Sequence, residues 1–276
     1  MATVIALSSL VARGSVGLRV TVPALQQLGH EVIALPTILL SSHLGHAGVA
    51  GAGVAAETLD AMIEALDANG WLDRADAVLT GYLPSADHVA VAAALTARMR
   101  RDRPDIPLFC DPVLGDAPNG LYVPESVAEA VRDLLIPLAT YLKPNGFELG
   151  YLTGRVIASV DDAAAAAQAL GVPHVLASSI PAGAGRLANV LATGGRAMAC
   201  TVALAPDAPH GTGDLLTALM AGRVVGAAPL TPEDAAARAL AGVASAIAAS
   251  RSRDELTLSP ATPWHTAEPL AFTPLA

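Results

Sequence analysis

The sequence predicts an α/β fold, a three-layer sandwich in which helices cover both faces of a mostly parallel sheet. Apolar runs typical of buried strands alternate with segments of helical periodicity along most of the 276 residues. The first run, 3–10, is continuously apolar, as expected of a strand buried on both faces. The alternation stops at 186–205, where two strand-like runs meet at Gly194–Gly195 and predict a β-hairpin.

Each strand is placed by an apolar run bounded by small or polar residues. Residues 3–10 (TVIALSSL) end in small polar side chains, and 31–40 (EVIALPTILL) form the second run. The loop at 41–53 is rich in glycine and histidine and separates this run from the next helix. The expected strands are 3–10, 31–40, 76–82, 107–113, 139–143 and 174–179.

Helices are placed by apolar residues that recur at helical spacing between the strands. The segment 14–29 is bounded by glycines, and Gly29 is expected to close its helix. The expected helices are 14–29, 55–68, 86–101, 126–136, 146–153, 161–170, 213–225 and 231–250. We expect a single domain over 1–276, whose tail from about Glu255 is rich in proline and threonine and wraps the surface or frays.

Composition and charge exclude several classes of protein. The net charge is −9, and no basic run appears in which arginines could follow a phosphate backbone, so nucleic acid is not expected as a partner. Cys110 and Cys200 are too few for a disulfide framework and predict reduced thiols in a cytoplasmic protein. The N-terminus lacks the basic region of a signal peptide. The uncharged stretch 32–56 contains Pro36 and four glycines, which indicates a strand and a loop rather than a membrane span.

The strongest functional pattern is PHGTGDLLTALMAG at 209–222. Gly211 and Gly213 permit a tight turn that leads into an apolar helix, so free N–H groups and a helix dipole converge there. Such a turn, with Thr212 at its centre, can hold a phosphate or a developing oxyanion. Asp214 beside it can take a proton from a nearby hydroxyl. The alternative is a plain helix start with an acidic residue in its first turn.

Polar residues also follow two of the predicted strands. Asp111 and Asp116 lie in CDPVLGD, and Asn145 and Glu148 lie in KPNGFE. Because ligands bind at the carboxyl ends of the strands in such sheets, these side chains are expected in one crevice with Asp214. Carboxylates there can hold Mg²⁺ directly or through water, as phosphoryl transfer requires. Alternatively, Asp111 begins a simple Asp-Pro turn and Glu148 complements a helix dipole.

Two familiar nucleotide-binding motifs are excluded. A P-loop requires a lysine after its second glycine, and the only lysine of the chain is Lys143, in LKPN. The G-x-G-x-x-A pattern at 183–188 precedes a strand-like segment, whereas the dinucleotide fingerprint requires a helix there.

The order of the functional motifs resembles the pyridoxal kinase family of the ribokinase-like superfamily. The resemblance runs from about Val4 to Arg253, and GTGD is the part that the whole superfamily shares. The early S-S-x-V-A-R-G-x-V-G at 8–17 and SSH at 41–43 are similar to the pyridoxal branch more narrowly. The other segments that carry the resemblance are 79–83 (LTGYL), 110–124 (CDPVLGDAPNGLYVP), 143–154 (KPNGFELGYLTG) and 211–216 (GTGDLL).

The resemblance implies a homodimeric kinase that uses ATP and Mg²⁺ to phosphorylate the 5′-hydroxymethyl group of pyridoxal, pyridoxine or pyridoxamine. It does not decide whether a monovalent cation assists the reaction. It implies that Asp214 is the base and that Gly211, Thr212 and Gly213 form the anion hole. The implied substrate contacts are Ser9, which faces the pyridine nitrogen, Val16, His43 and Tyr82. The implied ATP contacts are Asp111, Asp116, Tyr122, Asn145, Glu148 and Ser178, of which Asp111, Asp116 and Glu148 also organise Mg²⁺, partly through water.

The chain departs from the family pattern mainly at the substrate end. Leu40 replaces an aromatic residue and Leu44 replaces a hydroxyl; Leu10 and Leu18 are further departures. Lys143 stands where threonine is common and can add a phosphate contact. Two alternatives follow: a kinase of the same fold that acts on hydroxymethylpyrimidine or another small alcohol, or a catalytically weak sensor that binds the vitamer.

Overall fold

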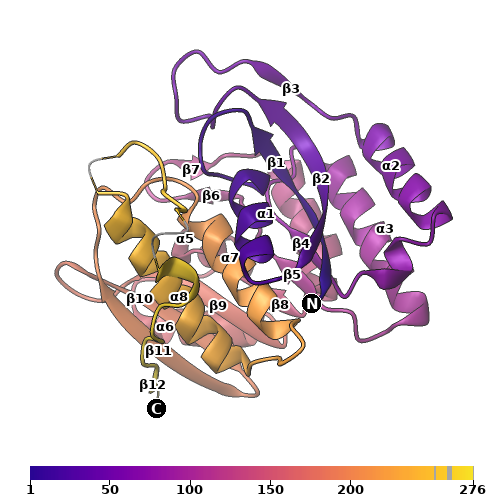
Figure 1. The fold of residues 1–276 in the computed structure, drawn as a ribbon. Coiled ribbons are helices and arrows are strands. Elements are labelled where there is room, and N and C mark those ends of the chain that lie inside the picture. Colours follow the sequence, from indigo (N-terminus) through magenta and orange to yellow (C-terminus); the bar gives the residue numbers. More distant parts are fainter. Residues whose placement is uncertain (252, 260–262, 276) are drawn as a thin grey trace.

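The computed structural model describes residues 1–251, 253–259 and 263–275 and confirms the predicted α/β sandwich (Figure 1). A ten-stranded sheet has the order β12-β11-β10-β9-β8-β5-β4-β1-β2-β3, and the run from β9 to β2 is parallel. Its strands are β1 Thr3–Val11, β2 Glu31–Leu40, β3 Gly51–Gly53, β4 Ala77–Thr80, β5 Leu108–Cys110, β8 Tyr141–Leu142, β9 His174–Pro181, β10 Arg186–Thr193, β11 Arg196–Ala203 and β12 Thr273–Pro274.

Helices cover both faces of the sheet because the buried strands present apolar residues on both sides. In β1, Val4 packs toward one face and Ile5 toward the other. The first face is covered by α1 Leu18–Gln27, α7 Thr212–Val224 and α8 Pro232–Ala249. The second is covered by α2 Ala56–Ala68, α3 Ala86–Asp102, α4 Glu125–Ala130, α5 Gly146–Thr153 and α6 Val160–Ala169.

The predicted hairpin over 186–205 is confirmed. β10 and β11 pair antiparallel up to Thr193 and Arg196. Between them Gly194 and Gly195 have φ of 56° and 76°, the conformation that a two-residue hairpin turn of this kind requires.

Several predicted boundaries differ from the structure for local reasons. The helix expected at 14–29 begins only at Leu18, because Gly14 and Gly17 have positive φ. The helix expected at 126–136 is α4 followed by a π-helical turn, Val131–Leu135, and a 3₁₀ turn, Ile136–Leu138. Pro137 has no N–H to continue the α-helical bonds.

Two short features lie in segments where no strand was expected. β3 is in the glycine-rich loop, and a separate hairpin of β6 Gly115–Asp116 and β7 Gly120–Leu121 follows β5. A 3₁₀ turn at Leu72–Arg74 precedes β4. The strands β5 and β8 are shorter than predicted, since the chain leaves the sheet early to form the loops of the candidate site.

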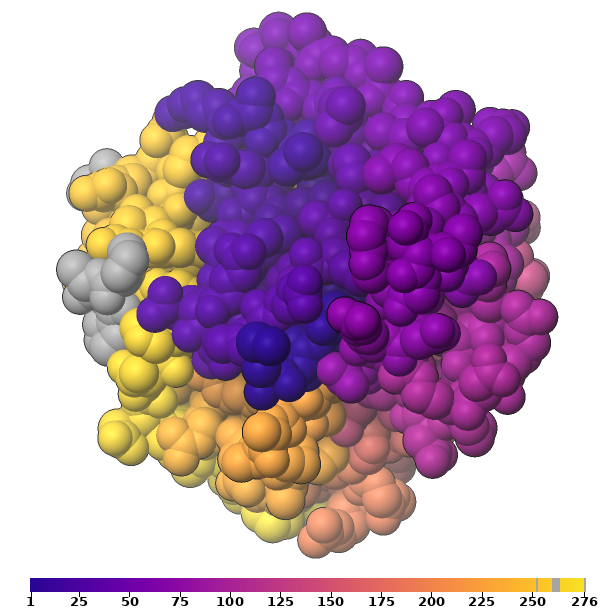
Figure 2. Space-filling model, turned by 45° about the vertical axis from the view of Figure 1, so that its right-hand side comes forward, coloured from indigo at the N-terminus to yellow at the C-terminus, as the bar shows by residue number. Residues whose placement is uncertain are grey.

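The C-terminal segment packs against the rest of the chain. Leu256 and Trp264, the latter in the 3₁₀ turn Pro263–His265, are buried in the core that α7 and α8 share. Figure 2 shows this segment, in yellow, beside the N-terminal part of the chain in indigo and purple, and Arg13 forms an ion pair with Asp254 there. Among the residues that the structure describes, no helix is long and apolar enough to cross a membrane.

Candidate active site

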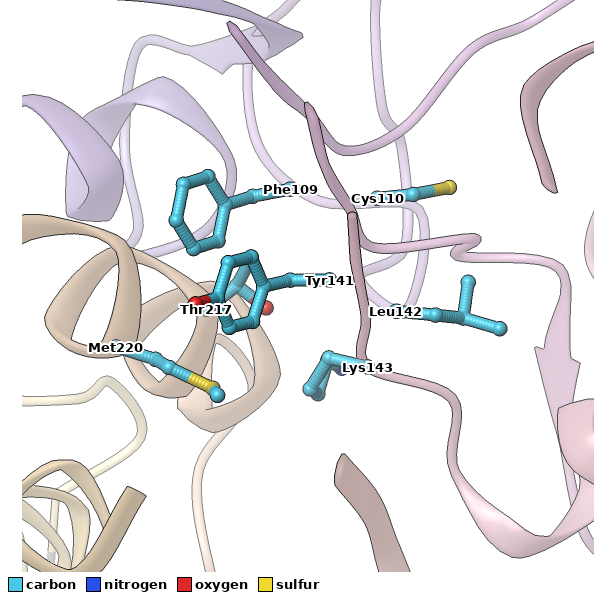
Figure 3. Close-up of a pocket in the computed structure, with 7 residues that line it drawn as sticks. All are labelled: Phe109, Cys110, Tyr141, Leu142, Lys143, Thr217 and Met220. Atoms are coloured by element: carbon cyan, nitrogen blue, oxygen red, sulfur yellow. The ribbon is translucent and has the colours of Figure 1, made fainter. Parts of the chain in front are cut away.

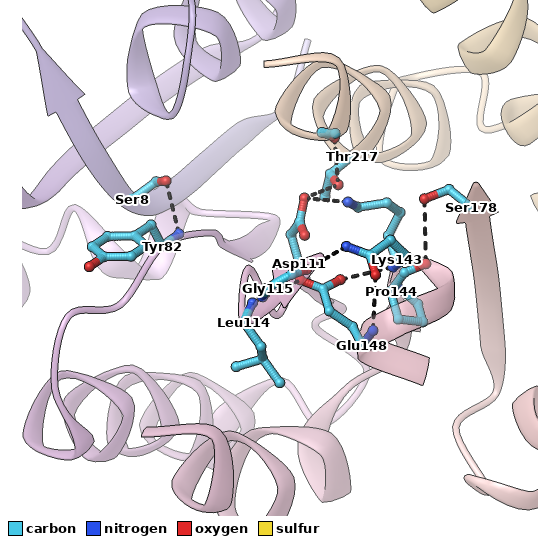
Figure 4. A network of polar contacts seen from close by, with 12 residues as sticks. Ser8, Tyr82, Asp111, Leu114, Gly115, Lys143, Pro144, Glu148, Ser178 and Thr217 are labelled. Carbon is cyan, nitrogen blue, oxygen red and sulfur yellow. Dashed lines mark hydrogen bonds and ion pairs between the residues drawn. The ribbon is translucent and has the colours of Figure 1, made fainter. Parts of the chain in front are cut away.

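Four parallel strands bring their carboxyl ends to one edge of the sheet, next to the start of α7. β4 lies between β1 and β5, and β8 follows β5, so the residues after these strands are neighbours. Figure 4 shows the polar contacts that connect the loops after β5 and β8 with α5 and α7.

The turn before α7 has a geometry suited to an anion. Gly211 has φ of 94°, and a Cβ on it would lie 1.7 Å from the carbonyl oxygen of Ser15, so only glycine fits. The N–H groups that follow, at Thr212 and Gly213, belong to the first turn and have no acceptor within the helix. The helix dipole adds partial positive charge at the same place.

Asp214 lies in the first turn of α7 and faces the ends of β1 and β4. A Cβ built on Gly81, just after β4, would lie 3.8 Å from its Oδ1. Burial, followed by the charge of Asp111, raises the pKa of Asp214 to about 6, against the opposing effects of the Gly17 N–H and Lys143. A carboxylate with this pKa is ionised at neutral pH and is basic enough to accept a proton.

Asp111, just after β5, is held by a buried ion pair. Lys143 Nζ lies 3.0 Å from Asp111 Oδ2, and the Thr217 hydroxyl donates to the same oxygen at 2.8 Å. The side chains of Lys143 and Asp111 are only 9% and 4% exposed, so this contact is largely removed from water. Thr217 comes from α7, and the contact therefore connects that helix to the loops after β5 and β8.

The Lys143 ammonium lies among three carboxylates beside the glycine turn. Burial on its own lowers the pKa of Lys143, but the charges of Asp111, Glu148 and Asp214 outweigh it and raise the pKa. A Cβ on Gly213 would lie 3.0 Å from Nζ, which shows how close the ammonium is to the start of α7. The site therefore contains a fixed cation at neutral pH.

Glu148 is buried, and its carboxylate organises the surrounding loops. Oε1 accepts from the Leu114 N–H at 2.8 Å, and Oε2 accepts from the Asn145 N–H at 2.8 Å. The Asn145 side chain in turn caps α5 through the Glu148 N–H and donates to the Gly115 carbonyl at 2.7 Å. Burial raises the pKa of Glu148, and Lys143 opposes that shift.

A small cavity lies beside the ends of β5 and β8, next to α7 (Figure 3). Phe109 and Tyr141 stack there with ring centroids 4.5 Å apart. The residues that line the cavity are Phe109, Cys110, Tyr141, Leu142, Lys143, Thr217 and Met220. Lys143 and Thr217, the two residues that contact Asp111 Oδ2, both line this cavity, so its packing helps to hold them in place.

The other residues implied in the ATP site lie beside this network. Asp116 is on the β6–β7 hairpin and accepts from Asn119 at 2.8 Å. Burial and a hydrogen bond to Asp116 raise the pKa of Tyr122, whose side chain is half-exposed. Ser178 is bridged to Asn145 through the backbone, and its N–H donates to the Pro144 carbonyl at 2.8 Å.

The residues implied in the substrate pocket occupy the ends of β1 and β4 and the loop after β2. Ser9 packs against Gly17, where a Cβ would lie 2.3 Å from the serine hydroxyl, and Val16 is half-buried close by. Tyr82 follows β4, and burial raises the pKa of its phenol. The ring centroid of His43 lies 4.3 Å from that of His210, the residue before Gly211.

The structure gives three residues of the site contacts that the sequence does not predict. Lys143 was expected only as a phosphate contact, whereas it pairs with Asp111. Thr217 lies three residues after Asp214, and helical spacing from that residue is the signal that finds it. Ser8 is buried and accepts from the Tyr82 N–H at 3.2 Å; alternation along β1 separates its side chain from that of Ser9.

The carboxylates present fit a Mg²⁺ that is held mainly by phosphates and water. Lys143 and Thr217 both use Oδ2 of Asp111, so these two contacts leave its Oδ1 unused. Glu148 already accepts from backbone N–H groups with both oxygens and is better suited to contact through water. Mg²⁺ commonly binds proteins through one or two carboxylates and keeps several waters.

The chain is similar to known kinases in three respects: a family model, the sequences of curated relatives and solved structures. The sequence model of the phosphomethylpyrimidine kinase family matches residues 26–258. The chain is 37% identical over 235 residues to the pyridoxine/pyridoxal/pyridoxamine kinase of Bordetella avium, which covers 82% of this chain and 79% of that protein. The solved pyridoxal kinase of Entamoeba histolytica has a TM-score of 0.92 at 25% identity over 99% of both chains. That of Leishmania donovani, in complex with ADP and pyridoxamine, has a TM-score of 0.89 at 28% identity over 99% of both chains.

Proposed function

Because the chain belongs to the pyridoxal kinase family, we propose that it transfers the γ-phosphoryl group of ATP to the 5′-hydroxymethyl group of pyridoxal, pyridoxine or pyridoxamine. The observation that carries the proposal is the glycine turn at the start of α7 with Asp214 beside it. An anion-binding turn adjacent to a base is what phosphorylation of an alcohol needs.

In the proposed reaction Asp214 accepts the proton of the substrate hydroxyl. The hydroxyl oxygen forms a bond to the γ-phosphorus, the bond from that phosphorus to the oxygen bridging to the β-phosphate breaks, and ADP leaves with that oxygen. The N–H groups of Thr212 and Gly213 stabilise the charge on the transferring group. The pKa of Asp214, raised to about 6, keeps it ionised at neutral pH while bringing it nearer to that of a useful base.

Lys143 and the buried carboxylates form the phosphate end of the proposed site. The Lys143 ammonium, fixed by Asp111, is placed to balance negative charge next to the glycine turn. Asp111, with Asp116 and Glu148 through water, would hold Mg²⁺, which supplies charge neutralisation on the nucleotide phosphates when bound. Tyr122, Asn145 and Ser178 are proposed to lie along the nucleotide, Asn145 chiefly by shaping the loop through Gly115.

At the other end, Ser9, Val16, His43 and Tyr82 are proposed to contact the vitamer. The end of β2 and the loop after it are the part of this pocket that differs most from the family pattern, at Leu40 and Leu44. Because these two residues differ from the family pattern, hydroxymethylpyrimidine or another small alcohol is the alternative phosphoryl acceptor. The sensor alternative is less well supported, because Asp214 and the glycine turn are both present.

The deciding experiment measures ADP formation by the purified protein with ATP and Mg²⁺. Pyridoxal, pyridoxine, pyridoxamine and hydroxymethylpyrimidine are supplied in parallel at equal concentration. Turnover that is fastest with a B6 vitamer supports the proposal, and phosphorylated product identified by mass spectrometry separates it from simple ATP hydrolysis. Turnover only with hydroxymethylpyrimidine selects the alternative kinase, and nucleotide binding without turnover on any of the four selects the sensor.

Two further properties are predictions. The family resemblance implies a homodimer, and sedimentation of the purified protein at several concentrations measures it. The cysteine content predicts a cytoplasmic location, and fractionation of the source cells measures it.

A further inference from the structure

A cluster of imidazole and carboxylate groups lies outside the phosphate end of the site. One ligand atom from each of His43, His46 and Glu255 lies within 4.8 Å of the other two. The His43 and His46 rings are 3.9 Å apart between centroids, and His46 Nε2 is 3.9 Å from Glu255 Oε1. The three residues come from the loop after β2 and from the C-terminal segment, which are far apart in the sequence.

The carboxylate in this cluster has one oxygen available for a ligand. Glu255 Oε2 accepts from the Ser15 N–H at 3.1 Å. Glu255 Oε1 is buried and, within the described part of the chain, has no hydrogen-bond partner. Arg13 Nη1 lies 3.5 Å from Oε1 and His46 Nε2 lies 3.9 Å from it. Arg13 therefore offers this oxygen charge without a hydrogen bond, and the lone pairs of Oε1 stay available to a bound cation.

The two histidines supply the nitrogen ligands of the cluster. His43 Nδ1 accepts from the Gly45 N–H at 3.1 Å, so this nitrogen carries a lone pair, and a metal bound there takes the place of that hydrogen bond. Imidazole nitrogen together with carboxylate oxygen is a ligand set typical of Zn²⁺ and related transition metals, whereas Mg²⁺ prefers oxygen ligands alone.

We propose that His43, His46 and Glu255 bind a divalent transition-metal ion of the Zn²⁺ type. Ligand atoms of a tetrahedral zinc site lie roughly 3.3 Å apart, as follows from zinc–ligand bonds of about 2.0–2.1 Å. The 3.9 Å between His46 and Glu255 is close to this value, and the 4.8 Å limit for the cluster requires a contraction of about 1.5 Å at most. Metal binding therefore draws the loop after β2 toward the C-terminal segment.

The position of the cluster connects it to the glycine turn. The His43 ring lies 4.3 Å from the ring of His210, which immediately precedes Gly211. Glu255 Oε2 accepts a hydrogen bond from the Ser15 N–H, and the Ser15 carbonyl packs against Gly211. A bound ion thus connects the loop at 41–46, the N-terminal loop and the C-terminal segment beside the anion turn. Because His43 is also proposed to contact the vitamer, we expect the ion to restrain the loop at 41–46 and to compete with the vitamer for His43.

The test is a calorimetric titration of Zn²⁺ into the full-length protein without nucleotide. We expect one site, whose affinity falls more than about tenfold in His46→Gln and in Glu255→Gln, since each removes a ligand. His265→Gln, outside the cluster, is the matched control and keeps the affinity. Arg13→Gln should bind Zn²⁺ more tightly than the unsubstituted protein, because it removes a cation 3.5 Å from the ligand oxygen.

Two further readouts keep the proposal testable apart from catalysis. Zn²⁺ should raise the unfolding temperature of the unsubstituted protein and raise it less in His46→Gln. Bound Co²⁺ should show the absorption of a four-coordinate nitrogen and oxygen site. The proposal is overturned if folded His46→Gln, checked by circular dichroism, binds Zn²⁺ as well as the unsubstituted protein. An ion displaced by MgADP alone would belong to the carboxylates around Asp111 and would equally overturn it.

Discussion

Around Asp111 the polar side chains are buried and paired, whereas around His43 they lie half-exposed on a loop. Lys143, Thr217 and Glu148 each have defined partners at the phosphate end. At the substrate end the loop after β2 carries Leu44, which is 60% exposed. A buried charge tolerates little change because its partners cannot be replaced by water. Leu44 on the exposed loop can therefore differ from the family pattern without disturbing the buried residues of the phosphate end.

The largest effect is expected from Asp214→Asn, which keeps the shape of the side chain and removes the base. Turnover should fall by about 10²- to 10⁴-fold, the range of general base catalysis. Steady-state ADP formation measures it. The dissociation constant of MgADP serves as the control and should change little, because the glycine turn is retained. Near-normal turnover would mean that a group other than Asp214 accepts the proton.

The next effect concerns the buried ion pair. Lys143→Met leaves Asp111 without its cation and should reduce the free energy of unfolding by about 3–5 kcal/mol. Urea denaturation at pH 7 measures it. The double variant Lys143→Met with Asp111→Asn should recover part of the loss, since no unpaired charge then remains at position 111.

An exposed ion pair supplies the matched control. Arg132 Nε lies 2.8 Å from Asp133, and both side chains are largely exposed. Arg132→Ala should change the free energy of unfolding far less than Lys143→Met does, because water screens and replaces the partners of a surface pair. Equal losses in Lys143→Met and Arg132→Ala would contradict the contrast between the two environments.

Patterns within short segments predicted most of the fold. The order of strands and helices, the hairpin at Gly194–Gly195 and the position of the glycine turn all follow from local periodicity and turn residues. The π-helical turn before Pro137 and the β6–β7 hairpin were missed, because neither interrupts the apolar pattern clearly.

Long-range pairing explains what the sequence could not predict about the site. Placing Asp111, Glu148 and Asp214 near one another required only that parallel strands end at the same edge. The partner of Asp111 required knowing that β5 and β8 are adjacent, which places Lys143 beside it. The contact of His43 with His46 is local, but its contact with His210 depends on how the loop after β2 folds over the sheet edge.

A smaller effect is expected in the pH dependence of kcat/KM. Its acid limb should have a midpoint near pH 6, because Asp214 must be ionised and its pKa is raised to about 6. Asp111 contributes to that rise, so Asp111→Asn should lower the pKa and move the limb to lower pH. The profile is measured with saturating ATP. Asp116→Asn is the control and should leave the midpoint in place; a limb that fails to move in Asp111→Asn would assign it to another group.

The smallest effect is expected at the substrate end, from Leu44→Thr, which restores the hydroxyl common in the family. Leu44 is largely exposed, so the free energy of unfolding should change by no more than about 0.5 kcal/mol. One added hydrogen bond to a bound vitamer is worth about 0.5–1.5 kcal/mol, which corresponds to a decrease in KM of roughly tenfold or less. The change should be confined to the vitamer, with the KM of ATP unchanged, because the partners found for Asp111, Lys143 and Glu148 do not come from the loop at 41–46. A Leu44→Thr variant that altered the KM of ATP as strongly as that of pyridoxal would show that the two ends are coupled.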